Sequence, residues 1–442
     1  MTSDNHDTRR FGVFRFAIGA KGAFKVFERI LFILRRYGFS PNKIDQALKQ
    51  FVEILSIHDS SATFPTPALI VERYPHIIQK YQAEGIEFAL HGLKHIDYSQ
   101  LSYDEQMNDL AEAKKIFSQA EIHYSGFRTP YLRRDNSLDK AIRDAGISYS
   151  SNQPIIWDAV KIESLDDSER NSYTKGLEFY NSWSANERVS LPCIKDGIVR
   201  IPVSLPDDEM LLDRIRKKDQ KFLTRAWRYI LDETYQRGEL FTLQIHPERI
   251  AMCTGSLSSI LAEARQREPK IWIAAMHEID QWWRMRSETE LNILDVSDDH
   301  YFISVNGPED LSILLKNVNT GVLGEPFIGG YNFVDEKEFS FQASSFPGVG
   351  ISEGLYEQWA EYLRQQGYLV EQIKHGKKYA CSLFGTGDDL WSEVEIVKFI
   401  EKTNEPLLRL NLWPKRARSA LCITGDLDAL TLWDYGLRIF NK

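Results

Sequence analysis

The sequence predicts an α/β fold in which parallel strands alternate with helices. Between residues 42 and 286, segments with helical periodicity alternate with short apolar segments, and each apolar segment ends in a polar loop. This alternation is typical of β-α-β units, whose strands pair in parallel. After the acidic linker "DVSDDH" the chain has glycine-rich turns such as "GEPFIGGYNF" and one clear helix, "EGLYEQWAEYLRQQG". We therefore expect a β/α barrel followed by a separate, smaller α+β region.

The elements of the first region follow from local patterns. A helix is expected from about Asn42 to His58, and Ser102 with Glu105 forms a capping box that opens a helix running to Phe117. Further helices are expected in "ERYPHIIQKYQAEG", from about Asn136 to Ala145, in "FLTRAWRYILDETYQRG" and in the second half of "KIWIAAMHEIDQWWRMR". Strands are expected in "SATFPTP", "IEFALHG", "HYSGFRTPY", "ISYSSN", "GIVRIPVSLPDD", "LFTLQIHPERI" and at the start of "KIWIAAMHEID". In such barrels the loops at the carboxyl ends of the strands build the active site.

The composition is that of an ordinary globular protein. The chain has 442 residues, 43% hydrophobic and 26% charged, which suits two or three domains with a sizeable core. Its formal net charge of −9 argues against a partner bound through nucleic-acid phosphates. The four cysteines lie far apart without a C-x-x-C pair, which predicts buried thiols in a reducing compartment. Without a secretory-signal pattern or an uncharged run long enough to span a bilayer, we expect a cytoplasmic protein.

The first 41 residues form a basic segment with two open interpretations. From Arg9 to Arg36 there are eight Lys or Arg residues against the single Glu28, and apolar side chains recur on one helical face. These side chains are Phe24, Phe27, Leu31 and Leu34. Such an amphipathic helix either packs its stripe on the domain core, which is the commoner use, or lies on an anionic membrane surface. The second interpretation would make the protein peripheral to a membrane.

The strongest chemical signal is the segment "HGLKHIDYS", which directly follows an apolar strand. His91 and His95 stand four residues apart, a spacing that projects both side chains to the same side of a helical turn, where they can share one metal ion. Two ordinary surface histidines would give the same spacing by chance. A hydrolytic metal site usually takes three protein ligands and leaves a position open for water, so a third ligand is required.

Four segments in order resemble the motifs of the NodB-homology polysaccharide deacetylases, carbohydrate esterase family 4. They are "SATF", "IEFALHGLKH", "GFRTPYL" and "LQIHPERI". The resemblance implies a distorted (β/α) barrel that removes N- or O-acetyl groups from sugars with a divalent metal. The paired acids that open the family pattern are missing from the expected place, "RRYGFSPNKIDQ", where Asp45 stands alone inside a helix. The family's fourth block is not recognisable either.

The segment "ALCITGDLDA", far along the chain, offers the missing acids. An apolar strand there ends at Gly425 and is followed by Asp426 and Asp428. It resembles the family's first strand, in the variant whose two acids are separated by one residue, so the resemblance implies a circularly permuted barrel. Permutation is physically reasonable because domain termini tend to lie near one another at the surface. The alternative is that the two acids belong to a turn that caps a helix beginning near Leu430.

The resemblance then implies a metal centre. Asp428, His91 and His95 would hold a divalent metal, with zinc as the expected ion, which polarises the acetyl carbonyl and a water. Asp426 would be the general base that takes the proton of the water.

Three further residues complete the implied site. Arg128 would orient Asp426 and keep it ionised, with a structural salt bridge as the alternative. The backbone N–H of Tyr131 would stabilise the oxyanion. His246 would protonate the leaving amine as general acid, with a pKa near neutrality, and the alternative is a satisfied core histidine. Weaker candidates for the sugar cleft, for which surface loop acids are the more natural interpretation, are Trp157, Asp158, Asp207 and Asp208.

These predictions divide the chain into four parts: the basic segment 1–41, the barrel 42–297, the small α+β region 298–413, and a strand and helix at 414–442 that complete the barrel. The predicted function is metal-dependent hydrolysis of the acetyl group of an N-acetylated sugar or glycan, a non-peptide carbon–nitrogen bond. Two alternatives stay open. One is a catalytically silent glycan-binding or scaffold protein on the same barrel, and the other is a hydrolase of a different non-peptide amide.

Overall fold

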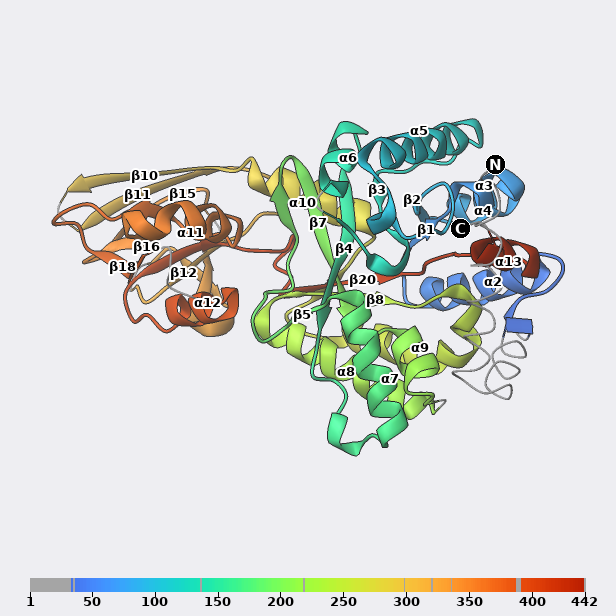
Figure 1. The fold of residues 1–442 in the computed structure, drawn as a ribbon. Helices are drawn as coiled ribbons and strands as arrows, with labels where there is room; N and C mark the ends of the chain where they lie inside the picture. Colours follow the sequence, from blue (N-terminus) through green and yellow to red (C-terminus); the bar gives the residue numbers. More distant parts are fainter. Residues whose placement is uncertain are drawn as a thin grey trace.

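A ten-stranded sheet forms the centre of the computed structural model, which describes residues 33–34, 36–135, 137–217, 219–297, 299–318, 321–334, 336–386 and 391–440 (Figure 1). Its strands are β1 (Thr63–Thr66), β2 (Glu87–Leu90), β3 (Gly126–Phe127), β4 (Tyr149–Ile156), β5 (Trp183–Ser184), β6 (Cys193–Lys195), β7 (Ile198–Leu205), β8 (Leu240–Gln244), β9 (Ile271–Ile273) and β20 (Ser419–Thr424). The order is β6-β7-β4-β3-β2-β1-β20-β8, with β5 beside β4 and β9 beside β20. Every pair is parallel except β6 with β7, so the predicted parallel α/β fold is confirmed.

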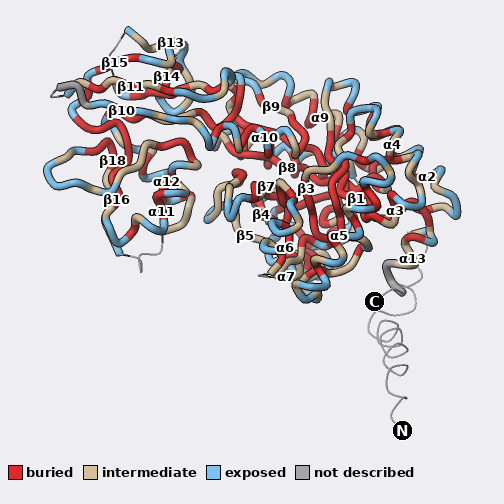
Figure 2. Tube along the Cα trace, turned by 90° about the horizontal axis from the view of Figure 1, so that it is seen from above, coloured by how far each residue is buried: buried red, intermediate tan, exposed pale blue. Residues whose placement is uncertain are grey.

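The sheet curls until its two sides meet. β7 and β8 are far apart in the hydrogen-bonded order, yet they lie in contact, and the backbone N–H of Thr242 donates to Ser204 Oγ at 3.3 Å. Buried residues concentrate on the strands, while exposed residues lie on the outer faces of the helices (Figure 2). This arrangement is a distorted (β/α) barrel, with a packed interior and an outer layer of helices.

Helices connect the strands and cover the sheet. They are α2 (Asn42–Ile57), α3 (Ala68–Arg73), α4 (Pro75–Ala83), α5 (Tyr103–Gln119), α6 (Leu138–Asp144), α7 (Asp167–Tyr180), α8 (Gln220–Arg237), α9 (Ile250–Gln266), α10 (Met276–Ser287) and α13 (Leu432–Phe440). Ser102 and Glu105 form the predicted capping box of α5. The helix predicted in "ERYPHIIQKYQAEG" is interrupted at Tyr74: α3 ends at Arg73, and α4 begins at Pro75. Proline has no backbone N–H to donate inside a helix, but it suits the first turn of one.

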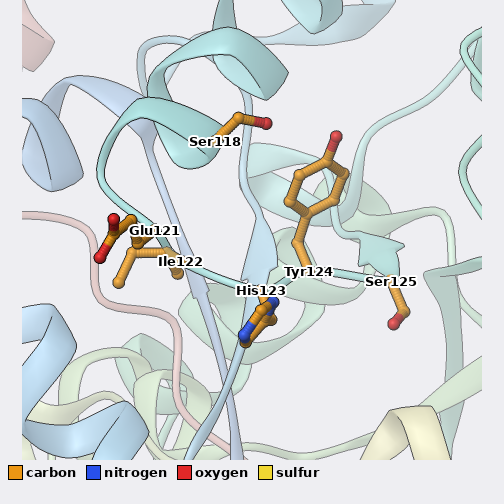
Figure 3. A pocket seen from close by; sticks show the side chains of 6 residues that line it. All are labelled: Ser118, Glu121, Ile122, His123, Tyr124 and Ser125. Atoms are coloured by element: carbon orange, nitrogen blue, oxygen red, sulfur yellow. The ribbon is translucent and has the colours of Figure 1, made fainter.

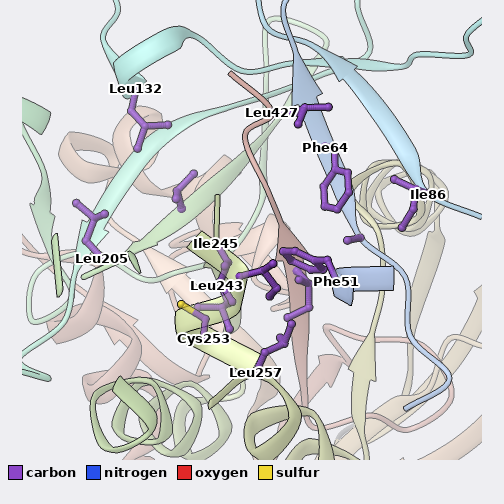
Figure 4. Close-up of a cluster of buried hydrophobic side chains, with 14 of the residues drawn as sticks. Phe51, Phe64, Ile86, Leu132, Leu205, Leu243, Ile245, Cys253, Leu257 and Leu427 are labelled. Atoms are coloured by element: carbon purple, nitrogen blue, oxygen red, sulfur yellow. The ribbon is translucent and has the colours of Figure 1, made fainter. Parts of the chain in front are cut away.

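β20 is a central strand of this sheet although it comes from the far end of the described chain. All six of its residues are buried, and it lies between β1 and β8. The register sets Thr424 opposite both Thr63 of β1 and Gln244 of β8. Figure 4 shows the shared core, to which α2, β1 and β8 contribute Phe51, Phe64 and Leu243. The helix that follows, α13, lies beside α2 in Figure 1, where Gly38 forms a parallel bridge with Thr431.

The chain between α10 and β20 forms the second region, at the left of Figure 1. Its elements are β10 (Glu290–Ser297), β11 (His300–Asn306), β12 (Ile313–Lys316), β13 (Leu323–Pro326), β14 (Tyr331–Val334), β15 (Glu338–Gln342), β16 (Phe346–Ile351), α11 (Glu353–Gln365), β17 (Val370–Gln372), β18 (Tyr379–Leu383), α12 (Glu393–Glu401) and β19 (Leu407–Leu410). They form sheets β10-β11-β15, β13-β14-β12-β19 and β17-β16-β18. The acidic segment "DVSDDH" was expected to be a linker, but its residues 295–297 belong to β10 and His300 belongs to β11, with Ser297 paired to His300, because the residues on either side alternate as strand residues do.

The basic segment predicted from Arg9 to Arg36 lies outside the described residues except for its last few positions. Within the described part of the chain, no helix is both long enough and apolar enough to cross a membrane.

Candidate active site

Two acids from the end of β20 and two histidines from the end of β2 meet at the carboxyl ends of the parallel strands. The backbone N–H groups of Gly425 and Leu427 donate to Thr63 O and Pro65 O at 3.0 and 2.9 Å, so the chain after β20 stays extended along β1. In an extended chain alternate residues face the same side. Asp426 and Asp428 therefore project together while Leu427, 1% exposed, enters the core.

His91, His95 and Asp428 form one buried cluster. Asp428 Oδ1 lies 3.4 Å from His91 Nε2 and 3.3 Å from His95 Nε2. One ligand atom from each of the three side chains lies within 4.8 Å of the others. Two imidazoles and one carboxylate are a common donor set for zinc and other divalent ions in hydrolytic sites. The predicted ligands are thus brought together from segments more than 300 residues apart in the chain.

The hydrogen bonds of His91 show that the cluster fits a cation. His91 Nδ1 lies 2.7 Å from the carbonyl oxygen of Arg128, and because a carbonyl only accepts, Nδ1 carries the proton. In the neutral ring Nε2 then presents a lone pair to the carboxylate of Asp428. His91 Nε2 is buried and has no hydrogen-bond partner among the described residues. His91 Nε2 and Asp428 Oδ1 are both electron-rich and face each other, and a metal ion bound between them would satisfy both.

Asp426 is held by a different set of partners. Arg128 Nη1 donates to Asp426 Oδ1 at 2.8 Å, and Gln244 Nε2 donates to Asp426 Oδ2 at 3.0 Å. The guanidinium of Arg128 is fully buried, and it also donates to Thr424 Oγ1 at 3.0 Å and Ser151 Oγ at 2.9 Å. A buried ion pair supported by this many hydrogen bonds has a fixed geometry, since each lost partner would leave a charge unsatisfied. Asp426 Oδ2 lies 4.0 Å from His91 Nε2, next to the cluster.

The two acids do not cap the helix that follows them. Thr431 Oγ1 accepts from the backbone N–H of Asp434 at 3.2 Å, and Asp434 Oδ2 accepts from the backbone N–H of Thr431 at 2.9 Å. This reciprocal pair satisfies the start of α13. The alternative that assigned Asp426 and Asp428 to helix capping is therefore wrong.

His246, at the end of β8, pairs with Asp208 at the end of β7. Asp208 Oδ1 lies 2.7 Å from His246 Nδ1, and Asp208 Oδ2 accepts from the backbone N–H of His246 at 2.8 Å. Burial disfavours the imidazolium, but the Asp208 carboxylate outweighs it and raises the pKa of His246 to about 10. Burial also acts against the Asp208 charge, and His246 and Arg249 outweigh it, so the pKa of Asp208 is lowered.

These contacts correct two expectations. His246 was expected to have a pKa near neutrality. In the structure it belongs to a buried ion pair that keeps the imidazole protonated at neutral pH. Asp207 and Asp208 were expected to be surface loop acids, but they are only 1% and 0% exposed because the ends of β7 and β8 cover them. Burial and the neighbouring charge of Asp208 raise the pKa of Asp207 to about 7.

Tyr131 lies beside the histidine cluster. Its ring meets the ring of His95 edge to face, with 4.5 Å between the centroids. Tyr131 and Leu132 both have positive φ values, 63° and 55°, which residues other than glycine rarely adopt. Such backbone conformations cost of order 1–3 kcal/mol each and gather at functional sites. Trp157, by contrast, is buried under Arg237, and Asp158 bonds to Asn186 on the surface.

A pocket adjoins the cluster. His95 and Asp428 line it together with Pro67, Leu69, Ile70, Arg73, Lys94, Ile96, Asp434 and Leu437. Another pocket, shown in Figure 3, is lined by Ser118, Glu121, Ile122, His123, Tyr124 and Ser125, between α5 and the amino end of β3. Ligands of parallel α/β sheets bind at the carboxyl ends of the strands. The pocket beside His95 is at that end, and the one in Figure 3 is at the opposite end.

Sequence reasoning missed Gln244 and named Asp208 only as a weaker candidate for the sugar cleft. Gln244 binds the proposed base, and Asp208 binds the proposed acid. A signal for both was present, since each lies at the end of a predicted strand. What the sequence lacked was the pairing of those strand ends across the barrel.

Part of the chain is similar in sequence to known polysaccharide deacetylases. Residues 40–150 match the family model described as "Polysaccharide deacetylase". Over 131 residues the chain is 28% identical to the peptidoglycan-N-acetylglucosamine deacetylase of Bacillus cereus, and the alignment covers 29% of this chain and 57% of the length of that protein.

Two solved structures are similar to part of this chain at lower sequence identity. A protein of Pseudomonas aeruginosa PAO1 described as a probable polysaccharide deacetylase is 16% identical, with a TM-score of 0.43 over 54% of this chain and 72% of that chain. Puue allantoinase is also 16% identical, with a TM-score of 0.42 and the same coverages of 54% and 72%.

The fold and the site define a parallel β/α barrel with a His-His-Asp cluster at the functional ends of its strands. Residues 40–150 match the polysaccharide deacetylase family model. The resemblance found in the sequence is thereby confirmed. The match contains His91, His95, Arg128 and Tyr131 but stops well before β20, so it does not test the circular permutation.

Proposed function

We propose that this protein is a metal-dependent hydrolase that removes the acetyl group of an N-acetylated sugar or glycan. The observation that carries the proposal is the meeting of Asp428 with His91 and His95 at 3.3–3.4 Å, beside an Asp426 held by Arg128. His91, His95 and Asp428 would be the ligands, and a bound divalent ion would polarise the acetyl carbonyl and a water. Zinc is the ion that this donor set favours.

Asp426 is the proposed general base. Its Oδ1 is occupied by Arg128, and its Oδ2 is the oxygen closer to the cluster, at 4.0 Å from His91 Nε2. Asp426 Oδ2 would take the proton of the attacking water. Arg128 and Gln244 would fix the rotation of the carboxylate, so that neither residue needs to move during the reaction.

His246 is the proposed general acid. Because Asp208 occupies Nδ1, His246 Nε2 is the nitrogen that would give its proton to the leaving amine. The ion pair with Asp208 keeps that proton in place at neutral pH. The backbone N–H of Tyr131 would stabilise the negative oxygen of the tetrahedral intermediate.

The position of β20 supports a circularly permuted arrangement. The strand that brings Asp426 and Asp428 follows the others in the chain yet lies beside β1, which is where the first strand of an unpermuted barrel would pair. We include this permutation in the proposal.

The test measures acetate release from N-acetylglucosamine oligosaccharides and from peptidoglycan fragments, beside ammonia release from cyclic amides, after loading with zinc. Asp426→Asn should keep bound metal near the wild-type content and lose activity, whereas Asp428→Ala should lose the metal. Equal loss of metal in both variants would contradict the division of roles. Metal binding without hydrolysis of any of these substrates would favour the glycan-binding alternative.

Asp45 supplies a matched control. It occupies the stretch where the acids of an unpermuted chain are expected, and it pairs instead with Lys80 and Tyr81 at 3.0 and 2.7 Å. Asp45→Asn should leave both metal content and activity unchanged.

A further inference from the structure

A chain of buried and half-buried charges runs from the first described residues to His246. Both terminal nitrogens of Arg36 donate to the carboxylate of Asp213, at 2.9 and 2.5 Å. On its other side Asp213 Oδ2 accepts from Arg249 Nη2 at 3.0 Å and from Arg249 Nε at 3.3 Å. The Arg36 and Arg249 side chains are 12% and 8% exposed and that of Asp213 is 26% exposed, so water screens these contacts only in part.

The same Arg249 reaches the Asp208–His246 pair. Arg249 Nη1 lies 3.9 Å from Asp208 Oδ2 and donates to Glu248 Oε1 at 2.8 Å. The helical turn η5 (Pro247–Arg249) begins directly after His246, and α2 packs against η5. Asp213 lies on the turn η4 (Met210–Arg214), just after Asp208. Backbone elements and charges thus connect the start of the described chain to the proposed acid.

We propose that Asp213 is a positioning residue that favours the ionic form of the Asp208–His246 pair by offsetting the charge of Arg249, and that Arg36 moderates this effect through its ion pair with Asp213. The proposal rests on the proposed function only in calling His246 the acid. Its electrostatic prediction concerns the pKa of His246 and can be tested without a substrate.

The sign of each contribution follows from the contacts. The charged or titratable groups that face His246 are Asp208, Arg249, Glu248 and Asp207. Arg249 opposes the imidazolium, and Asp213 offsets Arg249 because it stays ionised: burial acts against its charge, but Arg249 and Arg36 hold the pKa of Asp213 well below its usual range. Neutralising Asp213 leaves the charge of Arg249 uncompensated, which works against the protonated ring.

The experiment is a pH titration of the full-length protein labelled with ¹⁵N at histidine, with His246 assigned by the signal that His246→Gln removes. In Asp213→Asn the pKa of His246 should fall by about 1, since a compensating charge has been lost. In the double variant Arg36→Met, Asp213→Asn the pKa should return part of the way to the wild-type value, because a cation has been removed as well. If the two substitutions acted only by disturbing the structure, the double variant would shift the pKa of His246 further from the wild-type value than Asp213→Asn alone.

Controls and contrary results are defined by the same contacts. Asp232 pairs with Arg267 on the outer surface, so Asp232→Asn should not move the titration. Arg36→Lys keeps the charge and should titrate like the wild type. The proposal is overturned if a cooperatively melting Asp213→Asn leaves the pKa of His246 unchanged. If Asp213→Asn does not fold, Arg36→Met alone decides, since it should raise the pKa, and no change or a fall overturns the proposal. Because no turnover is measured, these outcomes stand apart from the presence or absence of deacetylase activity.

Discussion

Asp208→Asn removes the charge that holds the proton on His246 while keeping the shape of the side chain. Asp208 Oδ1 lies 2.7 Å from His246 Nδ1, and it is the main contribution that raises the pKa of His246 to about 10. Of the influences that remain, burial and Arg249 lower the pKa, and the smaller contribution of Glu248 raises it. We therefore expect the pKa of His246 in this variant to fall below its ordinary value of about 6.5.

The size of the effect follows from that change. A fall from about 10 to about 6.5 corresponds to about 5 kcal/mol in the preference of the folded protein for protonated His246. At pH 7 the imidazolium fraction would drop from nearly complete to about one quarter or less. If His246 is the acid, kcat at pH 7 should fall at least about fourfold from protonation alone and recover as the pH is lowered.

Stability should change with pH in a matching way. The folded pKa of His246 is raised, so its contribution is fully present below about pH 6.5 and is lost as the pH rises through about 10. Urea melts of the wild type should weaken between pH 7 and pH 10, and Asp208→Asn should lack this part of the slope.

The adjacent acid gives the control. Asp207 is equally buried but accepts from the backbone N–H of Met210 at 2.9 Å rather than from His246, and its pKa is about 7. Asparagine resembles protonated Asp207, so Asp207→Asn should keep the loss of stability between pH 7 and pH 10 that is expected of the wild type. An Asp208→Asn variant that is folded and still titrates His246 near pH 10, with unchanged kcat at pH 7, would refute the reasoning.

Two further predictions concern β20. Ile423 is fully buried in that strand, so Ile423→Ala should lower the free energy of unfolding by about 2–5 kcal/mol in urea melts, and removal of residues 418–442 should abolish both the cooperative melt and metal binding; a truncated chain that melts cooperatively with bound metal would contradict the placement of this strand. A Cβ on Gly425 would lie 2.8 Å from Ile245 O and 2.9 Å from the Phe64 ring, so Gly425→Ala should cost about 1–3 kcal/mol and weaken metal binding, whereas Gly436→Ala, with no atom within 4 Å, should do neither.

The sequence was sufficient where chemistry and local periodicity coincide. His91 and His95 stood out because their spacing and their place after a strand both suit a metal ligand, and Asp426 and Asp428 stood out because an apolar strand ended in two acids. The parallel fold followed from alternation alone. The histidine pair and the two acids each lie within about ten neighbouring residues, whereas the alternation that predicts the parallel fold extends along residues 42–286.

The rest depends on contacts that no local pattern contains. Asp207 and Asp208 look like loop acids because nothing in "SLPDDE" states that the end of β8 will cover them. The pKa of His246 depends on that same meeting, which brings a carboxylate to 2.7 Å from its ring. The acidic segment 295–300 resembled a linker because charge dominates its composition, although alternation on both sides forms a hairpin.

The place of β20 in the sheet also has a consequence for how the protein is made. The hydrogen bond between Thr424 and Leu243 joins residues 181 positions apart, and the whole second region lies between their strands. Until β20 has been synthesised, β1 and β8 have no common neighbour, and each presents an unpaired edge with apolar residues behind it. Long-range pairing of this kind folds slowly, and open edges attract other strands. Nascent chains of this protein should therefore depend on chaperones most during the interval in which the second region is complete and the strand carrying both acids is not.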